Sequence, residues 1–594
     1  MSGNFLKPYI IRRKNGVMNV SRGFSLIDIV VGAALFLVVF LSLAGVFRIS
    51  IGVVAHSKAR VGALAVAQER IESIRSLSYD DIGTQGGIPN GSLLQEDTVV
   101  LNGIEYHRRT LVQYVDSDRD GLGEADANTI PTDYKVVKVE VTWDVGGVEK
   151  SVSSVTHAMP PGIETNQGGG TLKLQVFDAL LQPIQGALVH IENSALNPIV
   201  STNVYTDENG RVTFPGSPSG NGYEITVSDT GYTADQTYSV SAELPTPVPG
   251  HLSVLEGETT EASFQIDEVA SLEIATWFPI REDDHTDDMT TTDDMQSFEH
   301  ISISGGTIVL SNSGSGYELS GSAVSEDIAP EYIAGWKSFS WIDETPLGTD
   351  ILYRIYDTDT DTLLPEGVVS GNAAGFSDSP VDLSGVSHET YPGLFVRADL
   401  TTTSTSTTPV LDKWVILYDE GPIPVGNVPF TLSGEKSIGF DGGGAPVLAY
   451  EEDLITNAFG TVTIADLVWD TYHISVLGAS SGYDVQSFCD PKPHVVNPGE
   501  EVHIDVYLTP HSDHSLLVAV YSDVGDPVPA GIDVMLSRPG YGETLTTGSC
   551  GQVLFTDLFQ ADDYTITVPT TIYGSFSDSD IVVSGASFTT VSLE

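Results

Sequence analysis

The sequence has very few cysteines and few basic residues, and both scarcities limit what the chain can be. Only two cysteines occur in 594 residues, so a framework of several disulfides is excluded and a single bridge is the most that can form. The chain has 26 Lys and Arg against 81 Asp and Glu, which gives a formal net charge of −55. A surface this acidic repels phosphate groups, so nucleic acid is not an expected partner.

The chain also lacks the usual short signatures of catalytic sites. It has no HExxH motif, no paired cysteines at metal-binding spacing and no glycine-rich phosphate loop. The segment GASSG at 478–482 fits the GxSxG formula of a nucleophile elbow, which requires a helix directly after it. The residues that follow, YDVQSF, are instead typical of a strand. We therefore predict that the protein is not an enzyme.

Turn-forming residues are abundant, in contrast to these scarcities. The sequence contains 59 glycines and 31 prolines, and Ser, Thr and Val dominate long tracts. This composition favours many short strands joined by turns. The length is too great for one core, so roughly three to six domains are expected.

One long apolar run lies near the N-terminus. Residues 29–47 carry no charge over about the length that crosses a bilayer, and basic residues precede them (Lys7, Arg12, Arg13, Lys14 and Arg22). The positive-inside rule predicts a cytoplasmic N-terminus and a single membrane pass, with the rest of the chain outside. No proline interrupts residues 24–77, and apolar residues continue at three- and four-residue steps, so one helix is predicted over this range.

The residues around the start of this helix carry a resemblance to a known family. Arg22-Gly23-Phe24-Ser25-Leu26-Ile27-Asp28 resembles the cleavage and methylation site of type IV prepilins. AQERIESIRSLSYDDIGTQGGIPNG, at 67–91, resembles the end of the pilin helix and the loop after it. The resemblance implies that prepilin peptidase cuts after Gly23 and that Phe24 becomes the methylated N-terminus.

The same resemblance implies a role for the acid in the apolar run. Asp28 would pair with the N-terminal amine of a neighbouring pilin subunit while the helices bundle, which gives a costly intramembrane charge a partner. The family usually has Glu at this position, so Asp is a departure from its pattern. Either Met1 or Met18 could be the true start of the chain.

The segment after the helix predicts a small β head with an acidic loop. Residues 92–157 contain two stretches of alternating apolar and polar residues, separated by DSDRDGLGEAD at 116–126. Three carboxylates of this loop match the first half of a calcium site, and a fourth could complete it (Asp116, Asp118, Asp120 and Asp126). The twelfth position is Ala127 instead of Glu, so calcium binding and a solvated turn both remain open.

Three later segments repeat one pattern, in which a glycine turn precedes an apolar strand and a tyrosine. The glycines are Gly210, Gly460 and Gly551, and the tyrosines are Tyr223, Tyr472 and Tyr564. A self-similar unit built from short alternating strands is a β-sandwich repeat. The repeats resemble the B-type repeats of bacterial surface adhesins and the carboxypeptidase regulatory-like domain, which are stalks or spacers.

Many adhesin repeats of this type carry a Lys–Asn or Lys–Asp isopeptide bond, which this sequence disfavours. No lysine follows Lys492, so the last repeat cannot form one. In the first repeat Lys173 lies between two leucines, and it points to solvent if they face the core.

Two features remain in the C-terminal part. Residues 270–420 weakly resemble the jelly-roll modules of extracellular carbohydrate-binding proteins, and their tryptophans lie in apolar runs, which favours core packing over sugar stacking (Trp336, Trp341 and Trp414). Cys489 and Cys550 fall in the second and third repeats. A bridge between them would fix the angle between the last two domains, although both could instead be free thiols.

The predicted fold is mainly β and multidomain, with a long N-terminal pilin α-helix, a small β-sheet head and a string of β-sandwich domains that includes a jelly-roll-like one. The predicted ranges are a prepilin leader at 1–23, a transmembrane and assembly helix at 24–77, a pilin-type β head at 78–165, a first β-sandwich repeat at 170–268, a jelly-roll-like β-sandwich at 270–420, and second and third repeats at 423–510 and 513–594.

These features predict a large minor type IV pilin-like subunit that displays β-sandwich modules on the cell surface, in adhesion or in a pilus tip. The alternative is a membrane-anchored carbohydrate-binding surface protein that does not enter a filament. The expected partners are other pilin subunits, prepilin peptidase, the membrane, and surface glycans or ligands on host or partner cells. Calcium is the one candidate cofactor.

Overall fold

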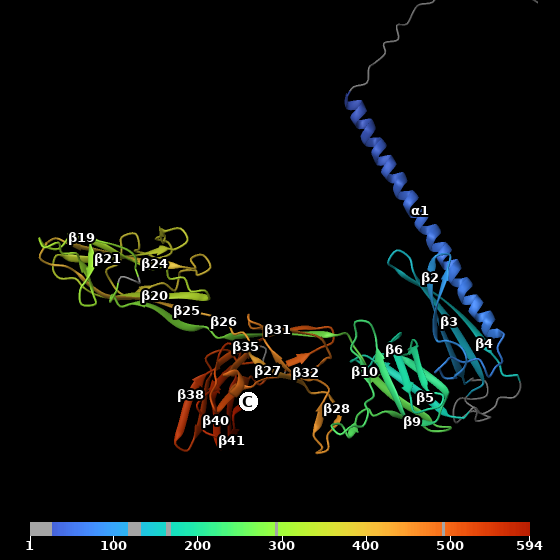
Figure 1. The fold of residues 1–594 in the computed structure, drawn as a ribbon. Coiled ribbons are helices and arrows are strands. Elements are labelled where there is room, and N and C mark those ends of the chain that lie inside the picture. Colours follow the sequence, from blue (N-terminus) through green and yellow to red (C-terminus); the bar gives the residue numbers. More distant parts are fainter. Residues whose placement is uncertain (1–25, 117–131, 162–167, 292–294, 490–493) are drawn as a thin grey trace, which may run out of the picture. The chain divides into compact units, whose positions relative to one another are not determined.

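The computed structural model describes residues 26–116, 132–161, 168–291, 295–489 and 494–594, and in these ranges the chain is mainly β (Figure 1). The chain divides into two compact units. The first contains Met1–Gln175, Leu188–Ile225 and His251–Ser263, and the second contains Val176–Ala187, Thr226–Gly250 and Phe264–Glu594.

The first unit begins with the long helix α1 (Leu26–Arg75), whose C-terminal half packs on an antiparallel sheet. The sheet has the order β1 (Glu96–Leu101), β2 (Ile104–Val115), β3 (Tyr134–Asp144) and β4 (Glu149–Ala158). The helix residues against it recur at three- and four-residue steps and are almost fully buried (Ala59, Ala63, Val66, Ala67, Ile71 and Ile74).

Small residues let the helix approach the sheet closely. The Tyr106 hydroxyl donates a hydrogen bond to the Ala59 carbonyl at 2.9 Å. A Cβ on Gly62 would lie 2.4 Å from the same hydroxyl, so a larger residue at that point of the helix would displace the tyrosine from its hydrogen bond. The predicted helix and the strands after it are therefore parts of one packed head.

The N-terminal half of α1, unlike the C-terminal half, exposes its apolar side chains. The large apolar side chains described between Val30 and Val54 are each more than half exposed. In the described residues, the stretch Ala33–Arg75 is long and apolar enough to cross a membrane by length and composition, with a mean hydropathy of 2.3 in its most apolar window.

The first repeat follows as a β-sandwich. One sheet contains β5 (Gly170–Phe177), β8 (Arg211–Ser217) and β13 (Thr259–Gln265). The other contains β6 (Leu188–Asn193), β7 (Val200–Tyr205), β9 (Gly220–Ser228) and the short β12 (Leu252–Val254). Leu172 and Leu174 are fully buried, and Lys173 between them points outward to Glu261, 2.6 Å away, as the alternation predicts.

The second repeat, in the second unit, is interrupted by another domain. Its first strand is β14 (Ala270–Phe278), which pairs antiparallel with β31 (Thr461–Leu467) and parallel with β35 (Glu501–Pro510). The Trp277 indole also donates a hydrogen bond to Asp505 of β35 at 2.7 Å. The remaining strands are β26 (Ile423–Pro424), β27 (Pro429–Gly434), β30 (Glu451–Ile455), β32 (Asp470–Val476), β33 (Tyr483–Cys489) and β34 (His494–Val496). Two further short strands, β28 (Ser437–Phe440) and β29 (Pro446–Leu448), form a hairpin.

This pairing corrects the boundary predicted at residue 270. Residues 270–278 belong to the second repeat, and the jelly-roll-like domain is inserted between β14 and β26. The two ends of the insertion meet, because Phe278 pairs with Ile423 and Arg281 pairs with Glu420. Alternating apolar residues continue on both sides of residue 280, so the pattern alone does not reveal which sheet receives each strand.

The inserted domain consists of two sheets. One contains β15 (Arg281–Asp287), β17 (Ile301–Ile303), β18 (Ile308–Leu310), β20 (Ile333–Glu344), β23 (Val381–Asp382) and β25 (Val410–Glu420). The other contains β16 (Met295–Glu299), β19 (Ser320–Ser325), β21 (Thr349–Asp357), β22 (Thr362–Leu363) and β24 (Leu394–Thr402). Trp336, Trp341 and Trp414 are at most 7% exposed, which places them in the core.

The third repeat again pairs its first strand with its last. The strand β36 (Ser515–Tyr521) lies between β39 (Gln552–Phe555) and β42 (Ala586–Ser592), and it is parallel to β42. The second sheet contains β37 (Asp533–Arg538), β38 (Tyr541–Thr546), β40 (Ala561–Thr571) and β41 (Gly574–Val583).

The structure explains why the same glycine and tyrosine recur in each repeat. Gly210, Gly460 and Gly551 have φ of +69°, +79° and +67°, which a side chain would strain. The repeated tyrosines are at most 1% exposed, and each hydroxyl donates to a backbone carbonyl four or five residues upstream (Tyr223 to Pro218, Tyr472 to Val468 and Tyr564 to Phe559).

Candidate functional site

Most of the site residues predicted from the sequence lie where the structure gives no account of their side chains. Gly23 and Phe24 are outside the described residues, as are Asp118, Asp120 and Asp126. Asp28 lies within α1, but its side chain is not described. Asp116 directly follows β2 and is half-buried. Processing, subunit pairing and calcium binding therefore stay predictions.

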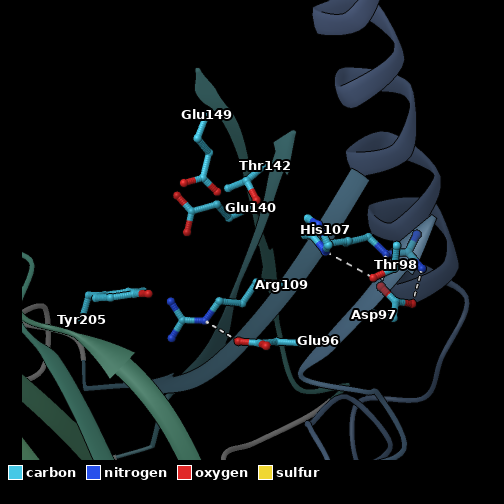
Figure 2. Close-up of a pocket in the computed structure, with 10 residues that line it drawn as sticks. Glu96, Asp97, Thr98, His107, Arg109, Glu140, Thr142, Glu149 and Tyr205 are labelled. Carbon is cyan, nitrogen blue, oxygen red and sulfur yellow. Dashed lines mark hydrogen bonds and ion pairs between the residues drawn. The ribbon is translucent and has the colours of Figure 1, made fainter. Parts of the chain in front are cut away.

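A polar cleft lies in the first unit, where the exposed face of the head sheet meets β7 of the first repeat (Figure 2). Its volume is about 440 Å³. Ten residues line it, and nine of them come from the four strands of the head (Glu96, Asp97, Thr98, His107, Arg108, Arg109, Glu140, Thr142, Glu149 and, from β7, Tyr205). The cleft thus combines two domains that the sequence presented as separate.

One arginine of the cleft is already neutralised. The Arg108 guanidinium forms two hydrogen bonds with Asp97, at 2.8 and 2.6 Å, and a third with Glu69 of α1 at 2.8 Å. The hydrogen bond from Arg108 lowers the pKa of Asp97, and the hydrogen bond from Asp97 raises the pKa of Arg108. This network fixes β1 and β2 to the helix and commits the Arg108 guanidinium to partners within the head.

The other arginine joins the two domains. Arg109 lies with its guanidinium 4.3 Å from the centre of the Tyr205 ring and donates a hydrogen bond to the carbonyl of Asn203. Its Nε is 3.8 Å from Glu96. Beside it, Gln95 Nε2 donates to the Ser201 carbonyl at 2.6 Å. These contacts hold the first repeat against the head.

The cleft can accept hydrogen bonds from a polar ligand. Glu140 is directly opposite Arg109 in the strand pairing, yet Arg109 turns toward Tyr205 and leaves Glu140 and Glu149 facing the cavity (Figure 2). Sequence reasoning missed this site because Tyr205 is 56 to 109 residues from the head residues that line it. The exposed polar face of an alternating strand was the available signal.

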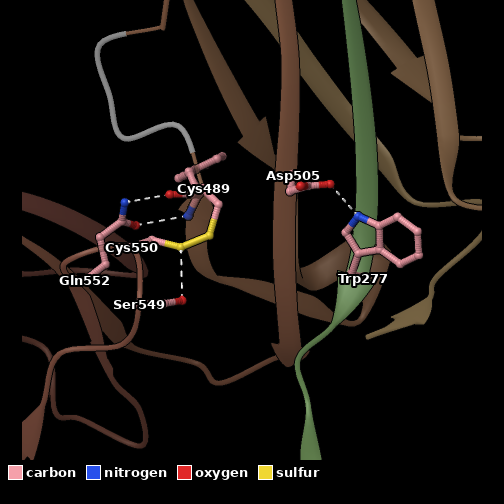
Figure 3. Close-up of a disulfide and its surroundings, with 7 residues drawn as sticks. Trp277, Cys489, Asp505, Ser549, Cys550 and Gln552 are labelled. Carbon is pink, nitrogen blue, oxygen red and sulfur yellow. Dashed lines mark hydrogen bonds between the residues drawn. A yellow bond between two sulfur atoms is a disulfide. The ribbon is translucent and has the colours of Figure 1, made fainter. Parts of the chain in front are cut away.

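A second cluster lies at the joint between the second and third repeats. Cys489 at the end of β33 and Cys550 before β39 form a disulfide, with Cα atoms 5.3 Å apart (Figure 3). Gln552 is 4% exposed and hydrogen bonds to both backbone groups of Phe488. The sequence predicted the pairing of the cysteines as one of two alternatives, but it gave no sign of the glutamine.

The linker at the same joint is also held by a buried acid. The Asp484 carboxylate, 1% exposed, accepts hydrogen bonds from His511 Nδ1 at 2.8 Å and from the Ser512 amide at 3.0 Å. The Ser512 hydroxyl accepts a hydrogen bond from the Asp557 amide at 2.8 Å. The joint is therefore a packed interface between the two repeats, supported by a covalent bond.

In comparisons with known proteins, one family model matches the region of the first repeat. Residues 171–266 match the family model of the carboxypeptidase regulatory-like domain. A search of curated proteins found no match to the chain.

Several solved structures align with large parts of the chain at low similarity. The Bacillus anthracis TIE protein is 10% identical, with 84% of this chain and 73% of that chain covered and a TM-score of 0.15. The major pilin subunit BcpA of Bacillus cereus is 11% identical, with 71% and 99% covered and a TM-score of 0.13. The major pilin SpaD of Corynebacterium diphtheriae is 12% identical, with 71% and 97% covered and a TM-score of 0.12. Chains with such low TM-scores do not superpose over their length, so no function follows from them.

Proposed function

We propose that the protein is a large minor type IV pilin-like subunit that displays β-sandwich modules on the cell surface, in adhesion or at a pilus tip. The observation that carries the proposal is the division of α1 into two halves. One half packs on the head through Ala59 to Ile74, and the other leaves apolar side chains from Val30 to Val54 exposed. An apolar surface of this size requires a bilayer or other apolar helices around it.

The residues just before the exposed apolar half of α1 support processing of the chain. Gly23 and Phe24 stand at the cleavage position of the prepilin pattern, and Asp28 is the fifth residue of the mature chain that this cleavage would produce. A carboxylate in an apolar environment is costly unless it is paired, and the new amine of a neighbouring subunit is a suitable partner. The exposed apolar half of α1 would thus serve first as a membrane anchor and then as an assembly helix.

The rest of the chain supports display at a distance from the membrane. The three sandwich repeats resemble domains that serve as stalks or spacers in other proteins. The inserted jelly-roll-like domain adds a further module to the second repeat. The tryptophans of that module are core residues, so they do not provide a sugar-stacking platform. We place the ligand site elsewhere on the modules, with the polar cleft of the first unit as the candidate.

The test is N-terminal peptide mass spectrometry on two fractions, sheared surface filaments and membranes. We expect a methylated Phe24 at the N-terminus of the chain from the filament fraction. An intact leader, or a mature chain confined to the membrane, would contradict assembly and favour the membrane-anchored carbohydrate-binding protein.

Two variants make this test specific for the carboxylate. Asp28→Ala should leave the processed chain in the membrane and remove it from filaments, whereas Asp28→Glu should retain assembly. The buried residues by which α1 packs on the head begin at Ala59, far from position 28, so neither variant disturbs the core of the head. Equal assembly of the two variants would show that the acid has no part in it.

A further inference from the structure

The strand order of the third repeat determines how it would respond to tension. β36, its first strand, is parallel to β42, its last, and the register runs from Ser515 opposite Ala586 to Tyr521 opposite Ser592. The start of β36 and the end of β42 therefore lie at opposite ends of the pair. Tension applied through these two points would slide the strands past each other and load all their hydrogen bonds together.

The disulfide joins the chain at a different point of the same sheet. Cys550 precedes β39, and the carbonyl of Gly551 accepts a hydrogen bond from the Val520 amide at 2.9 Å. Leu593, just after β42, donates to the Tyr521 carbonyl at 2.9 Å. Gly551 and Leu593 thus flank the same end of β36. Tension applied through Cys550 and the C-terminal strand would pull from one end and break the hydrogen bonds one after another.

We propose that the Cys489–Cys550 bridge carries tension directly from the second repeat to the third, so that the third repeat is peeled open instead of sheared. The bridge encloses a segment with a sequence separation of 61 residues, which includes β34, β35, the linker and the third-repeat strands β36, β37 and β38. Tension that passes through the sulfur atoms cannot extend this segment. Under tension the third repeat therefore unfolds, while β35, the last strand of the second repeat, stays in place because it lies within the enclosed segment.

The joint holds the bridge in this position through its other contacts. Gln552 ties β39 to Phe488 of β33 with two hydrogen bonds, and Asp484 holds the linker through His511 and Ser512. The cysteines are therefore the covalent part of an interface that also joins the repeats through hydrogen bonds. The use of this property by a cell rests on the proposed surface display, but the property itself does not.

The experiment is to stretch single molecules of the full chain in detergent, held by tags at both termini in an optical trap. Wild type is compared with the Cys489→Ser/Cys550→Ser double variant. The fully stretched wild type should be shorter by about 210 Å, because 61 residues at about 3.5 Å each stay enclosed. The unfolding force of the third repeat should rise when the bridge is absent, since its strands are then sheared. Leu536→Ala, which empties part of that repeat's core, identifies its unfolding event in both backgrounds.

Each outcome decides a part of the proposal. Equal stretched lengths would overturn it, because the bridge would then not lie in the path of the tension. A shorter wild type whose third repeat resists as strongly as the unbridged one would overturn the peeling geometry. If the double variant does not fold, the wild type is measured before and after a phosphine and water reduce the disulfide to two thiols, with the phosphine oxidised to its oxide. Failure of the proposed function would appear in the N-terminal peptides and not in these measurements.

Discussion

Gln552 of the third repeat forms two hydrogen bonds with the backbone of Phe488 in the second: its Nε2 donates to the Phe488 carbonyl at 2.9 Å, and its Oε1 accepts from the Phe488 amide at 3.0 Å. One buried side chain thus replaces the backbone partner that the end of β33 would have in a longer sheet. Cys489, the residue after Phe488, forms the disulfide and so links the same two repeats covalently.

We expect Gln552→Ala to loosen this joint even with the bridge intact. Two buried backbone groups would lose their hydrogen bonds to this side chain, and each costs about 1–3 kcal/mol when left unsatisfied, so local opening should become easier by up to about 2–6 kcal/mol. Hydrogen exchange of peptides from β33 measures this directly. Gln560→Ala, which removes an exposed glutamine from the same repeat, is the matched control. Unchanged exchange at Phe488 would show that the two bonds add nothing to the bridge.

The inserted domain should be removable without loss of the second repeat. Deletion of residues 281–420 joins Ile280 to Gly421, and the Cβ position of Gly421 is already 3.0 Å from the Ile280 Cα. The product has a four-residue loop, 279–280 with 421–422, between the paired residues Phe278 and Ile423, a common hairpin length. We expect the Cys489–Cys550 bridge and protease resistance to persist, as peptide mapping would measure.

A second deletion provides the contrast for this prediction. Removal of β31 (Thr461–Leu467) takes a partner strand away from β14 and should abolish protease resistance of the second repeat. The excised 281–420 segment, expressed alone, should bury its three tryptophans and emit at short wavelength. Loss of the bridge in the first deletion would mean that the insertion is needed for the repeat to fold.

The repeats could be predicted from the sequence because each depends on residues with strong local requirements. Gly210 has to adopt a positive φ, and Tyr223 has to reach a carbonyl five residues upstream, so a glycine and a tyrosine recur 12 or 13 residues apart in all three copies. The long helix could also be predicted from the sequence, because its apolar residues and its lack of proline are properties of one continuous segment.

The insertion and the polar cleft depend on contacts between distant residues, which no local pattern records. The strand β14 pairs with β35, more than 200 residues later, although its alternation suits either neighbouring domain. From the strand pairing alone, Arg109 could equally have formed an ion pair with Glu140. It contacts Tyr205 instead because the first repeat packs on the head. The cysteines were visible in the sequence, but their environment of Gln552 and Asp484 was not.

The acidic loop gives a direct test of calcium binding. We expect calcium to raise the melting temperature of the chelated protein, because a ligand bound only by the folded state stabilises it by about 2.7 kcal/mol at one hundred times its dissociation constant. Asp118→Asn should reduce this shift, since it removes a carboxylate from the predicted ligand set. Glu105→Gln, which removes an exposed charge from the neighbouring strand β2, should leave the shift intact. A melting temperature that does not respond to calcium would identify the loop as a solvated turn.

Lys135 should make the stability of the head depend on pH in the alkaline range. Its ammonium donates to the carbonyls of Tyr79 and Ile82 at 2.8 and 2.7 Å and lies over the Tyr79 ring. Burial lowers the pKa of Lys135 from 10.5 to about 8, against the opposing effect of nearby carboxylates. Between these values the unfolded chain holds a proton that the folded chain has released, so the contribution of this residue to stability rises with pH from about 8 to 10.5.

The comparison with Lys135→Met isolates this effect. The variant leaves the two carbonyls without their donor and should be less stable at every pH, and its deficit relative to wild type should widen from about pH 8 to about pH 10. Lys138→Met, which removes an exposed lysine from the same strand, is the control and should stay close to wild type. Denaturant unfolding at several pH values gives the deficit for each variant. A deficit that stays constant or shrinks over this range would mean that Lys135 keeps its proton in the folded head.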